Sequence, residues 1–307
     1  MQTILLQAAI LIACGTLWRA LRPGGLDPQI VRKTIGDLVY YLLLPALVLS
    51  VLWSAPLGAD SVRIAALAAS GVLAGLAIAA LMCRVFGTPH PSAGALVLAA
   101  GFPNATYLGL PVLESTLGPW ARSLAIQYDL FACTPLLLTL GIFLAQHYGQ
   151  ERREPAGRFL IALLKVPPLW AAALAIALNL GAAPSAPWLT ELLNMLGRAV
   201  IPLMLFSLGL SLRWDREAAR HLPMVLPVVA IQLLLTPLLV WWLAMWMGLE
   251  GGVLLGVVLE AAMPPMVLGL VLCDRYGLDT GLYAVTVTLG TALSLVTLPL
   301  WMVIAGY

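Results

Sequence analysis

Long apolar stretches follow one another along almost the whole chain, with only short polar breaks between them. A transmembrane helix needs about 20 apolar residues to cross a hydrocarbon core about 30 Å thick. Hydrophobic residues make up 62% of the 307 positions and charged residues only 10%. A soluble domain carries about 25% charged residues and could not bury so much apolar surface. The sequence therefore predicts an all-α membrane protein in which nearly every segment crosses the bilayer.

Divided at charged, glycine and proline residues, the apolar stretches predict ten transmembrane helices. The expected ranges are 2–18, 34–54, 62–84, 93–115, 120–146, 159–180, 187–212, 223–247, 252–274 and 281–304. If the N-terminus lies outside, the inner loops carry twelve Lys and Arg residues and the outer loops two. Cytoplasmic loops are enriched in these residues, so we expect a multi-pass protein of the cell (inner) membrane with both termini on the outer side. The inner residues are Arg19, Arg22, Arg32, Lys33, Arg84, Arg152, Arg153, Arg158, Arg213, Arg216, Arg220 and Arg275.

Residues that support catalysis, metal binding or nucleic-acid binding are few and scattered. The four cysteines have no paired or CxxC spacing, so they predict neither a disulfide framework nor a zinc site. Cys14 ends a lipobox-like stretch, but the chain begins without basic residues and we interpret Cys14 as a packed helix residue. His90, His147 and His221 lie near predicted span ends, and we assign them no chemistry. A net charge of +2 and the lack of a GxxxxGK[ST] loop argue against nucleic-acid binding and ATP hydrolysis.

Two parts of the chain repeat one another at an offset of 161 residues. The sequence VLAAGFP at 97–103 matches VLEAAMP at 258–264. After one residue of slippage, LGL at 108–110 matches LGL at 268–270. Since each unit contains five spans, an odd number, the second unit lies upside down relative to the first. The expected inverted five-helix repeats are residues 1–150 and 159–307.

Prolines fall in the middle of two equivalent spans, the fourth and the ninth. A proline removes a backbone donor and clashes with the preceding turn, so Pro103 and the pair Pro264 and Pro265 should break these helices near mid-bilayer. Freed backbone groups at this depth need protein or a water-filled cavity beside them. In inverted-repeat transporters such paired breaks form the substrate site, and the half-helix N-termini favour an anionic group. The alternative is a pair of kinks that only shape helix packing.

The stretch PNATYLGLP at 103–111 resembles the P-N-x-x-x-x-G-x-P signature of the auxin efflux carrier family. The segments EAAMP at 260–264 and DRYGL at 274–278 are similar to the family's second crossover and the loop that follows it. YYLLLPA at 40–46 and AVIPL at 199–203 resemble its second and seventh helices. The matches cover essentially the whole chain and indicate a bacterial member, related to the plant PIN auxin carriers and more distantly to bile acid:sodium symporters.

The resemblance implies a ten-helix fold in which helices one, two, six and seven form a scaffold, while the others form a transport bundle with a crossover of broken helices four and nine. It also implies a homodimer joined through the scaffold and an elevator-type, alternating-access movement of the crossover bundle. Bacterial members are thought to move small carboxylates such as malonate, and PIN proteins export auxin, itself a carboxylate. We therefore expect a secondary transporter of a small organic anion.

Asn104 is the residue expected to bind the substrate carboxylate most directly. It follows Pro103 at the start of the second half-helix, where its amide and nearby free N–H groups can donate hydrogen bonds, and it matches the crossover Asn of the family. A role in capping the half-helix is the alternative for this side chain. We also expect Thr106, Pro264 and Pro265 at the substrate site, as parts of the two breaks.

Two acidic residues lie deep enough inside predicted spans to need an explanation, because an acid at a span centre costs about 2.5–3.5 kcal/mol. Glu260 lies where PIN proteins carry a neutral Gln. We expect it to be protonated by burial or to hold a coupling cation, so that a proton or sodium ion takes the place of a cofactor, unless it is paired locally. Asp129 lies about one third of the way into the fifth helix, and we expect it and its neighbour Tyr128 at the substrate site.

Two other classes of function remain open. Asp129 and Glu260 could be the paired acids of an intramembrane enzyme, but no nucleophile with a base or metal set accompanies them. A ligand-sensing membrane protein could keep a transporter fold without transport, since fold does not settle function. We expect a transporter rather than an enzyme, with the lipid bilayer, an organic anion and a second copy of the chain as its partners.

Overall fold

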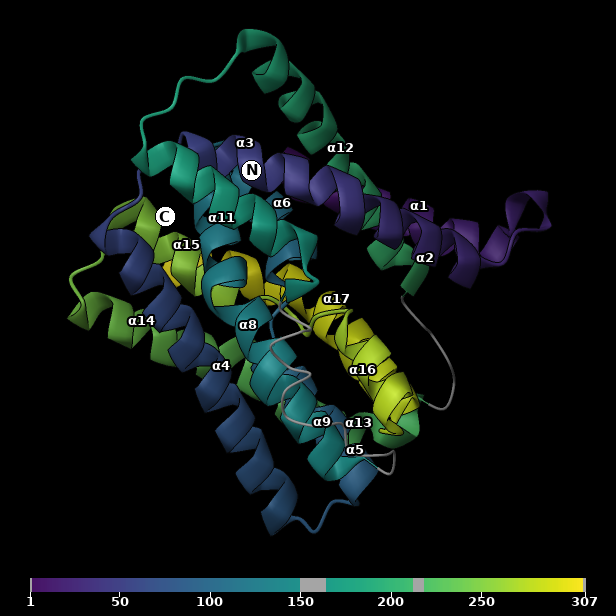
Figure 1. The fold of residues 1–307 in the computed structure, drawn as a ribbon. Helices are drawn as coiled ribbons and strands as arrows, with labels where there is room; N and C mark the ends of the chain where they lie inside the picture. The colour runs from purple at the N-terminus through teal and green to yellow at the C-terminus, as the bar shows by residue number, and fades with distance from the viewer. Residues whose placement is uncertain (1, 150–163, 212–217, 306–307) are drawn as a thin grey trace.

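The computed structural model describes residues 2–149, 164–211 and 218–305. Within these ranges every regular element is helical (Figure 1). The only extended pairing among the described residues is an isolated bridge between Pro103 and Pro265. The prediction of an all-α chain is therefore confirmed for the described residues. The predicted boundary between the repeats, at 150–159, lies outside them, as do five of the inner arginines: Arg152, Arg153, Arg158, Arg213 and Arg216.

The helices follow one another with short connections. The α-helices are α1 (Gln2–Leu21), α2 (Pro28–Leu38), α3 (Leu44–Trp53), α4 (Ala59–Val85), α5 (His90–Gly101), α6 (Leu110–Leu117), α7 (Ala121–Tyr128), α8 (Thr134–Leu136), α9 (Ile142–Tyr148), α11 (Pro167–Leu180), α12 (Pro187–Ser211), α13 (Ala218–Ala230), α14 (Thr236–Trp246), α15 (Gly251–Ala261), α16 (Gly269–Tyr276) and α17 (Thr280–Ile304). The short elements are the 3-10 turn η1 (Pro23–Gly25) and the π-helical turns η2 (Val39–Leu43), η3 (Ala105–Gly109), η4 (Asp129–Cys133), η5 (Leu137–Gly141) and η6 (Ile231–Leu235).

Four of the π-helical turns end two residues before a proline. In each, the residue before the proline donates its N–H to the carbonyl five residues earlier, as Thr134 does to Asp129. Proline has no N–H, and its ring would clash with the carbonyl four residues before it. The extra residue of a π turn relieves that clash without ending the helix. The prolines concerned are Pro45, Pro111, Pro135 and Pro237.

Six helical segments are long and apolar enough to cross a membrane. They are Pro28–Trp53, Ala59–Val85, Ala121–Tyr148, Pro187–Ser211, His221–Trp246 and Thr280–Ile304. The apolar stretches Ile10–Leu21, Pro167–Leu180 and Gly251–Ala261 are shorter. Two of the other predicted spans, 93–115 and 252–274, are each divided into two helices, α5 with α6 and α15 with α16. The chain is thus a multi-pass membrane protein, with broken helices where the sequence places mid-span prolines.

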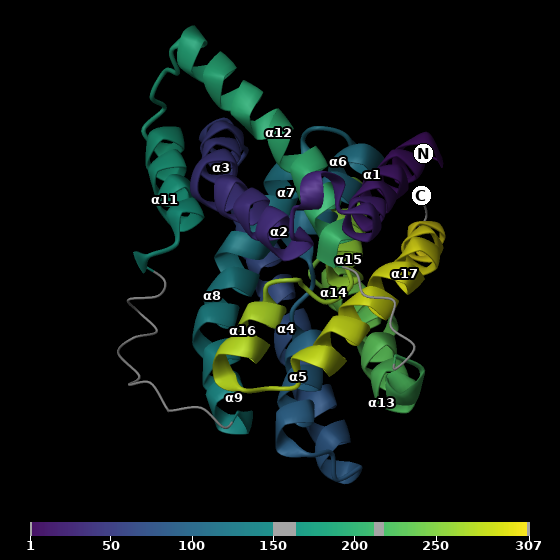
Figure 2. The same ribbon diagram turned by 90° about the vertical axis from the view of Figure 1, so that its right-hand side faces the viewer.

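The helices pack in two groups. In the first group α1 packs on α12, α11 on α3, and α12 on both α2 and α3. In the second group α4 packs on α5 and α14, α14 on α15, and α17 on α5 and α13. Figure 2 shows α2, α3, α11 and α12 in its upper part and α5, α9 and α13 in its lower part. The groups meet where η3 contacts α12 and η4 contacts α11.

Glycines hold α1 and α12 in backbone contact. A Cβ atom added to Gly15 would lie 3.0 Å from Cα of Gly209, and one added to Gly209 would lie 3.0 Å from Cα of Gly15. Thr16 donates to the carbonyl of Gly209 at 3.3 Å. Small residues allow membrane helices to approach this closely, and the association then depends on van der Waals packing.

A side-chain amide holds the end of α3 against α11. Asn179 Nδ2 donates to the carbonyls of Leu52, Trp53 and Ala55, at 3.1, 2.8 and 2.8 Å. The indole N–H of Trp53 in turn donates to the carbonyl of Ala183 at 3.0 Å. The last carbonyls of a helix have no partner within the helix, so these bonds satisfy the end of α3 and link it to α11.

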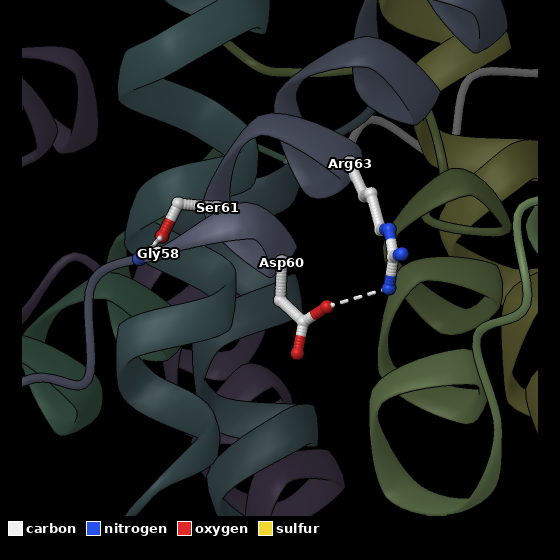
Figure 3. A network of polar contacts seen from close by, with 4 residues as sticks. All are labelled: Gly58, Asp60, Ser61 and Arg63. Carbon is white, nitrogen blue, oxygen red and sulfur yellow. Dashed lines mark hydrogen bonds and ion pairs between the residues drawn. The ribbon is translucent and has the colours of Figure 1, made fainter.

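Arg63 and Asp60 form an exposed ion pair at the start of α4. Arg63 Nη1 lies 3.1 Å from Asp60 Oδ1, and the two side chains are 41% and 59% exposed (Figure 3). The backbone N–H of Gly58 donates to Ser61 Oγ at 3.3 Å. Exposed pairs of this kind contribute little to stability, so Asp60 is an acid that can be replaced without disturbing the fold.

Substituting Gly209 by Ala should destabilise the protein by about 1–3 kcal/mol, because the new methyl group must push α1 away from α12. The measurement is the apparent melting temperature of purified protein in detergent, followed by tryptophan fluorescence. Gly36→Ala is the matched control: a Cβ at Gly36 meets nothing within 4 Å, so the better helix propensity of Ala should leave the melting temperature unchanged or raised. Equal effects of the two substitutions would contradict the close packing of α1 and α12.

Candidate functional site

The two broken helices pair with each other at their breaks. The N–H of Asn104 donates to the carbonyl of Pro264 at 2.8 Å, and the N–H of Met266 donates to the carbonyl of Phe102 at 2.9 Å. Between these bonds Pro103 lies opposite Pro265. Backbone groups that leave a helix inside a membrane must be satisfied within the protein. Each break supplies partners for the other.

Two further side chains satisfy carbonyls at the second break. Gln232 Nε2 donates to the carbonyls of Met263, at 3.0 Å, and Ala261, at 3.4 Å. The Tyr283 hydroxyl donates to the carbonyl of Met266 at 2.8 Å. Gln232 and Tyr283 are both fully buried, at 0% exposed, so these bonds are formed away from solvent and fix the extended segment after α15.

Asn104 lies where the helix resumes after the first break. Its carbonyl accepts from the N–H groups of Leu108, at 3.2 Å, and Gly109, at 3.0 Å. Its side chain makes no capping hydrogen bond to the new helix. The side chain is 3% exposed, and Nδ2 has no hydrogen-bond partner among the described residues. The capping alternative is therefore not observed, and a buried amide donor is left for another acceptor.

A cavity of about 90 Å³ lies between the two groups of helices. The first group contributes Tyr40 of η2 and apolar residues of α3 and α11, while the second contributes η3, η4, η5 and the segment 266–268. Most of the lining is apolar. The side chains with polar atoms in the lining are Tyr40, Asn104, Thr106, Tyr107, Asp129 and Thr134.

Asp129 is held in the cavity wall by two threonines. Thr106 of η3 donates to its Oδ2, and Thr134 donates to its Oδ1 at 3.0 Å. Asp129 is 7% exposed. Asp129 and Thr134 are five residues apart and face the same way because η4 is a π turn, whereas an α-helix brings together residues three or four apart.

Glu260 lies at the end of α15, facing η3. It is 0% exposed, and neither carboxylate oxygen has a hydrogen-bond partner among the described residues. A Cβ added to Gly109 would lie 2.7 Å from Glu260 Oε1. A larger residue at position 109 would force this carboxyl group to move. Glu260 does not line the cavity that Asp129 faces, although the two carboxyl groups lie close enough to interact electrostatically.

The predicted site residues fall into three places. Asn104, Thr106 and Asp129 line one cavity. Tyr128 is buried elsewhere, with its hydroxyl 3.5 Å from a Cβ built on Gly71 of α4. The remaining predicted residues form the breaks or lie behind them: Pro103, Pro264, Pro265 and Glu260.

The structure brings together several residues that were not predicted from the sequence. Tyr40 and Tyr107 lie in the quoted motifs but were not assigned to the site, and Thr134 was hidden by its unusual spacing from Asp129. His90 and His147, which lie at different predicted span ends, have ring centroids 6.3 Å apart. The Thr-Pro step at Thr134 is a signal that could have indicated the π turn.

A family model described as "Membrane transport protein" matches residues 3–156 and 152–302. The chain belongs to the membrane transport protein family. The resemblance to the auxin efflux carrier family is thereby confirmed.

Relatives from archaea and bacteria carry the same kind of name. An "Uncharacterized transporter" of Methanothermobacter thermautotrophicus is 31% identical over 277 residues, which cover 89% of this chain and 88% of the relative. The "Uncharacterized transporter MJ1031" of Methanocaldococcus jannaschii is 27% identical over 71% of this chain and 70% of its own. The "Uncharacterized transporter YfdV" of Escherichia coli is 25% identical over 72% of this chain and 71% of its own. The family and the names of these relatives thus indicate a transporter.

Gly109→Ala should lower the melting temperature in detergent, because its methyl group would press on the Glu260 carboxyl group; overpacking of this kind costs about 1–3 kcal/mol. In a Glu260→Ala background the same substitution should be neutral or stabilising, since the opposing group is gone. A coupling of about 0.5–3 kcal/mol between the two positions is expected from such a cycle. If Gly109→Ala acted equally in both backgrounds, Glu260 would not face Gly109.

Proposed function

We propose that this chain is a secondary transporter that moves a small organic anion, a carboxylate or auxin-like acid, across the cell membrane. One observation carries the proposal. The buried Asn104 amide has a donor without a partner among the described residues, at the point where a helix resumes inside a membrane span and beside a cavity. The first N–H groups of a helix have no partners within it and carry a partial positive charge. An amide donor and a helix N-terminus together suit a carboxylate.

The proposed architecture is ten spans in two inverted five-helix repeats, with a crossover at the two breaks. The packing supports it because equivalent pairs recur: α1 with α12 and α11 with α3, α4 with α5 and α14 with α15, and α5 with α17 and α15 with α7. Under the 161-residue offset each pair maps onto its partner pair. An inverted repeat requires such a reciprocal arrangement.

The proposed movement is of the elevator type. The cavity lies between the two helix groups, and both breaks belong to the second group. If the second group moves against the first, it carries Asn104, Thr106 and Asp129 together past Tyr40. The first group is then the scaffold, and we propose that it joins two copies in a homodimer. We also propose that both termini lie on the outer side, as the basic residues predict.

Glu260 is proposed as a coupling position. Removing a carboxylate from water without a partner is costly, and neither oxygen of Glu260 has one in the part of the chain that the structure describes. A proton, or a monovalent cation such as sodium, would neutralise it. Glu260 lies directly before the second break, so neutralising its charge affects the geometry of the crossover.

The first experiment is a thermal-shift screen of the purified protein against small mono- and dicarboxylates, at two pH values, with and without sodium. A stabilising acid is then tested for counterflow in proteoliposomes. Exchange of unmodified ligand supports a transporter, whereas a sensor would bind without exchange and an enzyme would change the ligand. Binding without counterflow would overturn the proposed function.

Asn104→Ala should lower counterflow at least about tenfold while the protein still folds. The reason is that the lost charge-assisted hydrogen bond to the substrate is worth about 1.5–3 kcal/mol. Uptake in proteoliposomes is the measurement, with the melting temperature as a check of folding. Asn194→Ala, on an exposed position of α12, is the matched control and should transport normally. Unimpaired uptake by the Asn104 variant would rule out its role.

Glu260→Gln should change the dependence of transport on pH or sodium, because glutamine is always neutral and keeps nearly the same shape. Relief from a buried, unpartnered carboxyl group should also raise the melting temperature. Transport is compared at two pH values and at two sodium concentrations. A variant with the same rate and the same dependence as the wild type would refute the coupling role.

A further inference from the structure

The described wall of the cavity carries an acid and no base. Among the described residues that line it, Asp129 is the one charged type, and Lys, Arg and His are all missing from the wall. Organic anions are commonly held by arginine, whose fork matches a carboxylate. Here an incoming carboxylate would meet an acidic side chain and an amide instead.

Among the described residues, Asp129 interacts electrostatically with groups that are neutral or acidic. Tyr40 of η2, Tyr107 of η3, Cys133 of η4 and Glu260 of α15 all interact with it electrostatically, and each is neutral or negative. Further along the wall, Arg32 and Asp37 of α2 act on Tyr107 with opposite signs. The only strong partners of Asp129 among the described residues are the hydroxyls of Thr106 and Thr134.

Those two hydroxyls hold the Asp129 carboxyl group as a hydrogen-bond acceptor. Each donates to a different oxygen of Asp129, and an ionised carboxylate accepts at both oxygens while a protonated one offers a donor. Two carboxylates that share a low-dielectric site cannot both be ionised, and they hold one proton between them. A carboxylate entering the cavity therefore has to bring a proton.

We infer that the substrate is a small carboxylic acid carried together with one proton, and that Asp129 and the substrate carboxylate share this proton in the cavity. The inference rests on the proposed transport function and adds a proton that moves with the substrate at Asp129, distinct from the proton or cation that neutralises Glu260. Asp129 is here a substrate-binding residue that sets specificity. Its partner must be a carboxylate small enough to enter this cavity.

The proton balance is simple. On the entry side, one proton leaves water and one carboxylate enters, and an O–H···O hydrogen bond forms between the substrate and Asp129 while Asn104 donates to the other substrate oxygen. On the exit side the substrate leaves, the proton returns to water, and Asp129 again accepts from Thr106 and Thr134. No bond to carbon changes. For a monocarboxylate the net charge moved is zero.

The test uses full-length protein in proteoliposomes that contain the pH dye pyranine. The probes are pyruvate and lactate as monocarboxylates and malonate as a dicarboxylate, with protein-free liposomes to measure passive entry. Counterflow with labelled probe first establishes transport; its failure with every probe would count against the proposed function. For a probe that exchanges, an inward gradient should acidify the lumen with one proton per substrate. Exchange without acidification would overturn the inference and leave the proposed function standing.

Asp129→Asn tests the place of the proton. Asparagine keeps the shape and still donates to a carboxylate but cannot take up a proton, so substrate-driven acidification should fall at least tenfold. Asp129→Glu should restore it in part. Asp60→Asn, which removes an exposed acid with a salt-bridge partner (Figure 3), is the matched control and should acidify like the wild type. Acidification kept by Asp129→Asn but lost by Glu260→Gln would place the proton on Glu260 and overturn the inference.

Binding supplies a second readout if Asp129→Asn fails to transport. Ligand-induced thermal stabilisation gives the affinity of wild type and variant at several pH values. A shared proton predicts that wild-type affinity falls about tenfold for each unit of rising pH in the alkaline range, and that the affinity of Asp129→Asn does not. A loss of packing alone would leave the two pH profiles parallel, and parallel profiles would overturn the inference.

Discussion

Backbone groups that leave a helix inside a membrane must find partners within the protein, and the rest of this structure depends on how that is done. The N–H of Asn104 reaches the carbonyl of Pro264, and the N–H of Met266 reaches the carbonyl of Phe102. The two breaks are 161 residues apart in the sequence, yet neither is satisfied without the other. The chain therefore has to bring its halves together before either broken helix is complete, and the functional site lies where they meet.

Prolines shape the site by a second route, away from the breaks. The π turn that precedes Pro135 places Asp129 and Thr134 on the same face, although they are five residues apart. The π turn before Pro111 leaves Thr106 facing the cavity and Gly109 facing Glu260. In a regular α-helix, without the extra residue, these side chains would point in other directions. The same residue type thus breaks two helices outright and adjusts the angular position of side chains in others.

The sequence predicted those features that follow from composition and from proline chemistry. The all-helical character and the breaks at Pro103 and Pro264 were expected because apolar length and the missing proline donor are local properties. The meeting of Asn104, Thr106 and Asp129 at one cavity could be expected only from the family resemblance. The contribution of Thr134 and the position of Tyr128 could not be predicted from the sequence. A prediction of side-chain direction assumes a constant number of residues per helical turn, whereas the extra residue of a π turn redirects every side chain after it.

The electrostatic character of the cavity also suits the cycle of a transporter. A site has to bind its substrate on one side of a membrane and release it on the other, so excessive affinity slows the cycle. A buried arginine would hold a carboxylate with a strong bidentate pair. A lone amide, a helix N-terminus and a proton shared with Asp129 hold it less strongly, and the hold weakens wherever the proton leaves. On this view the absence of a basic group from the described wall of the cavity is what makes release possible.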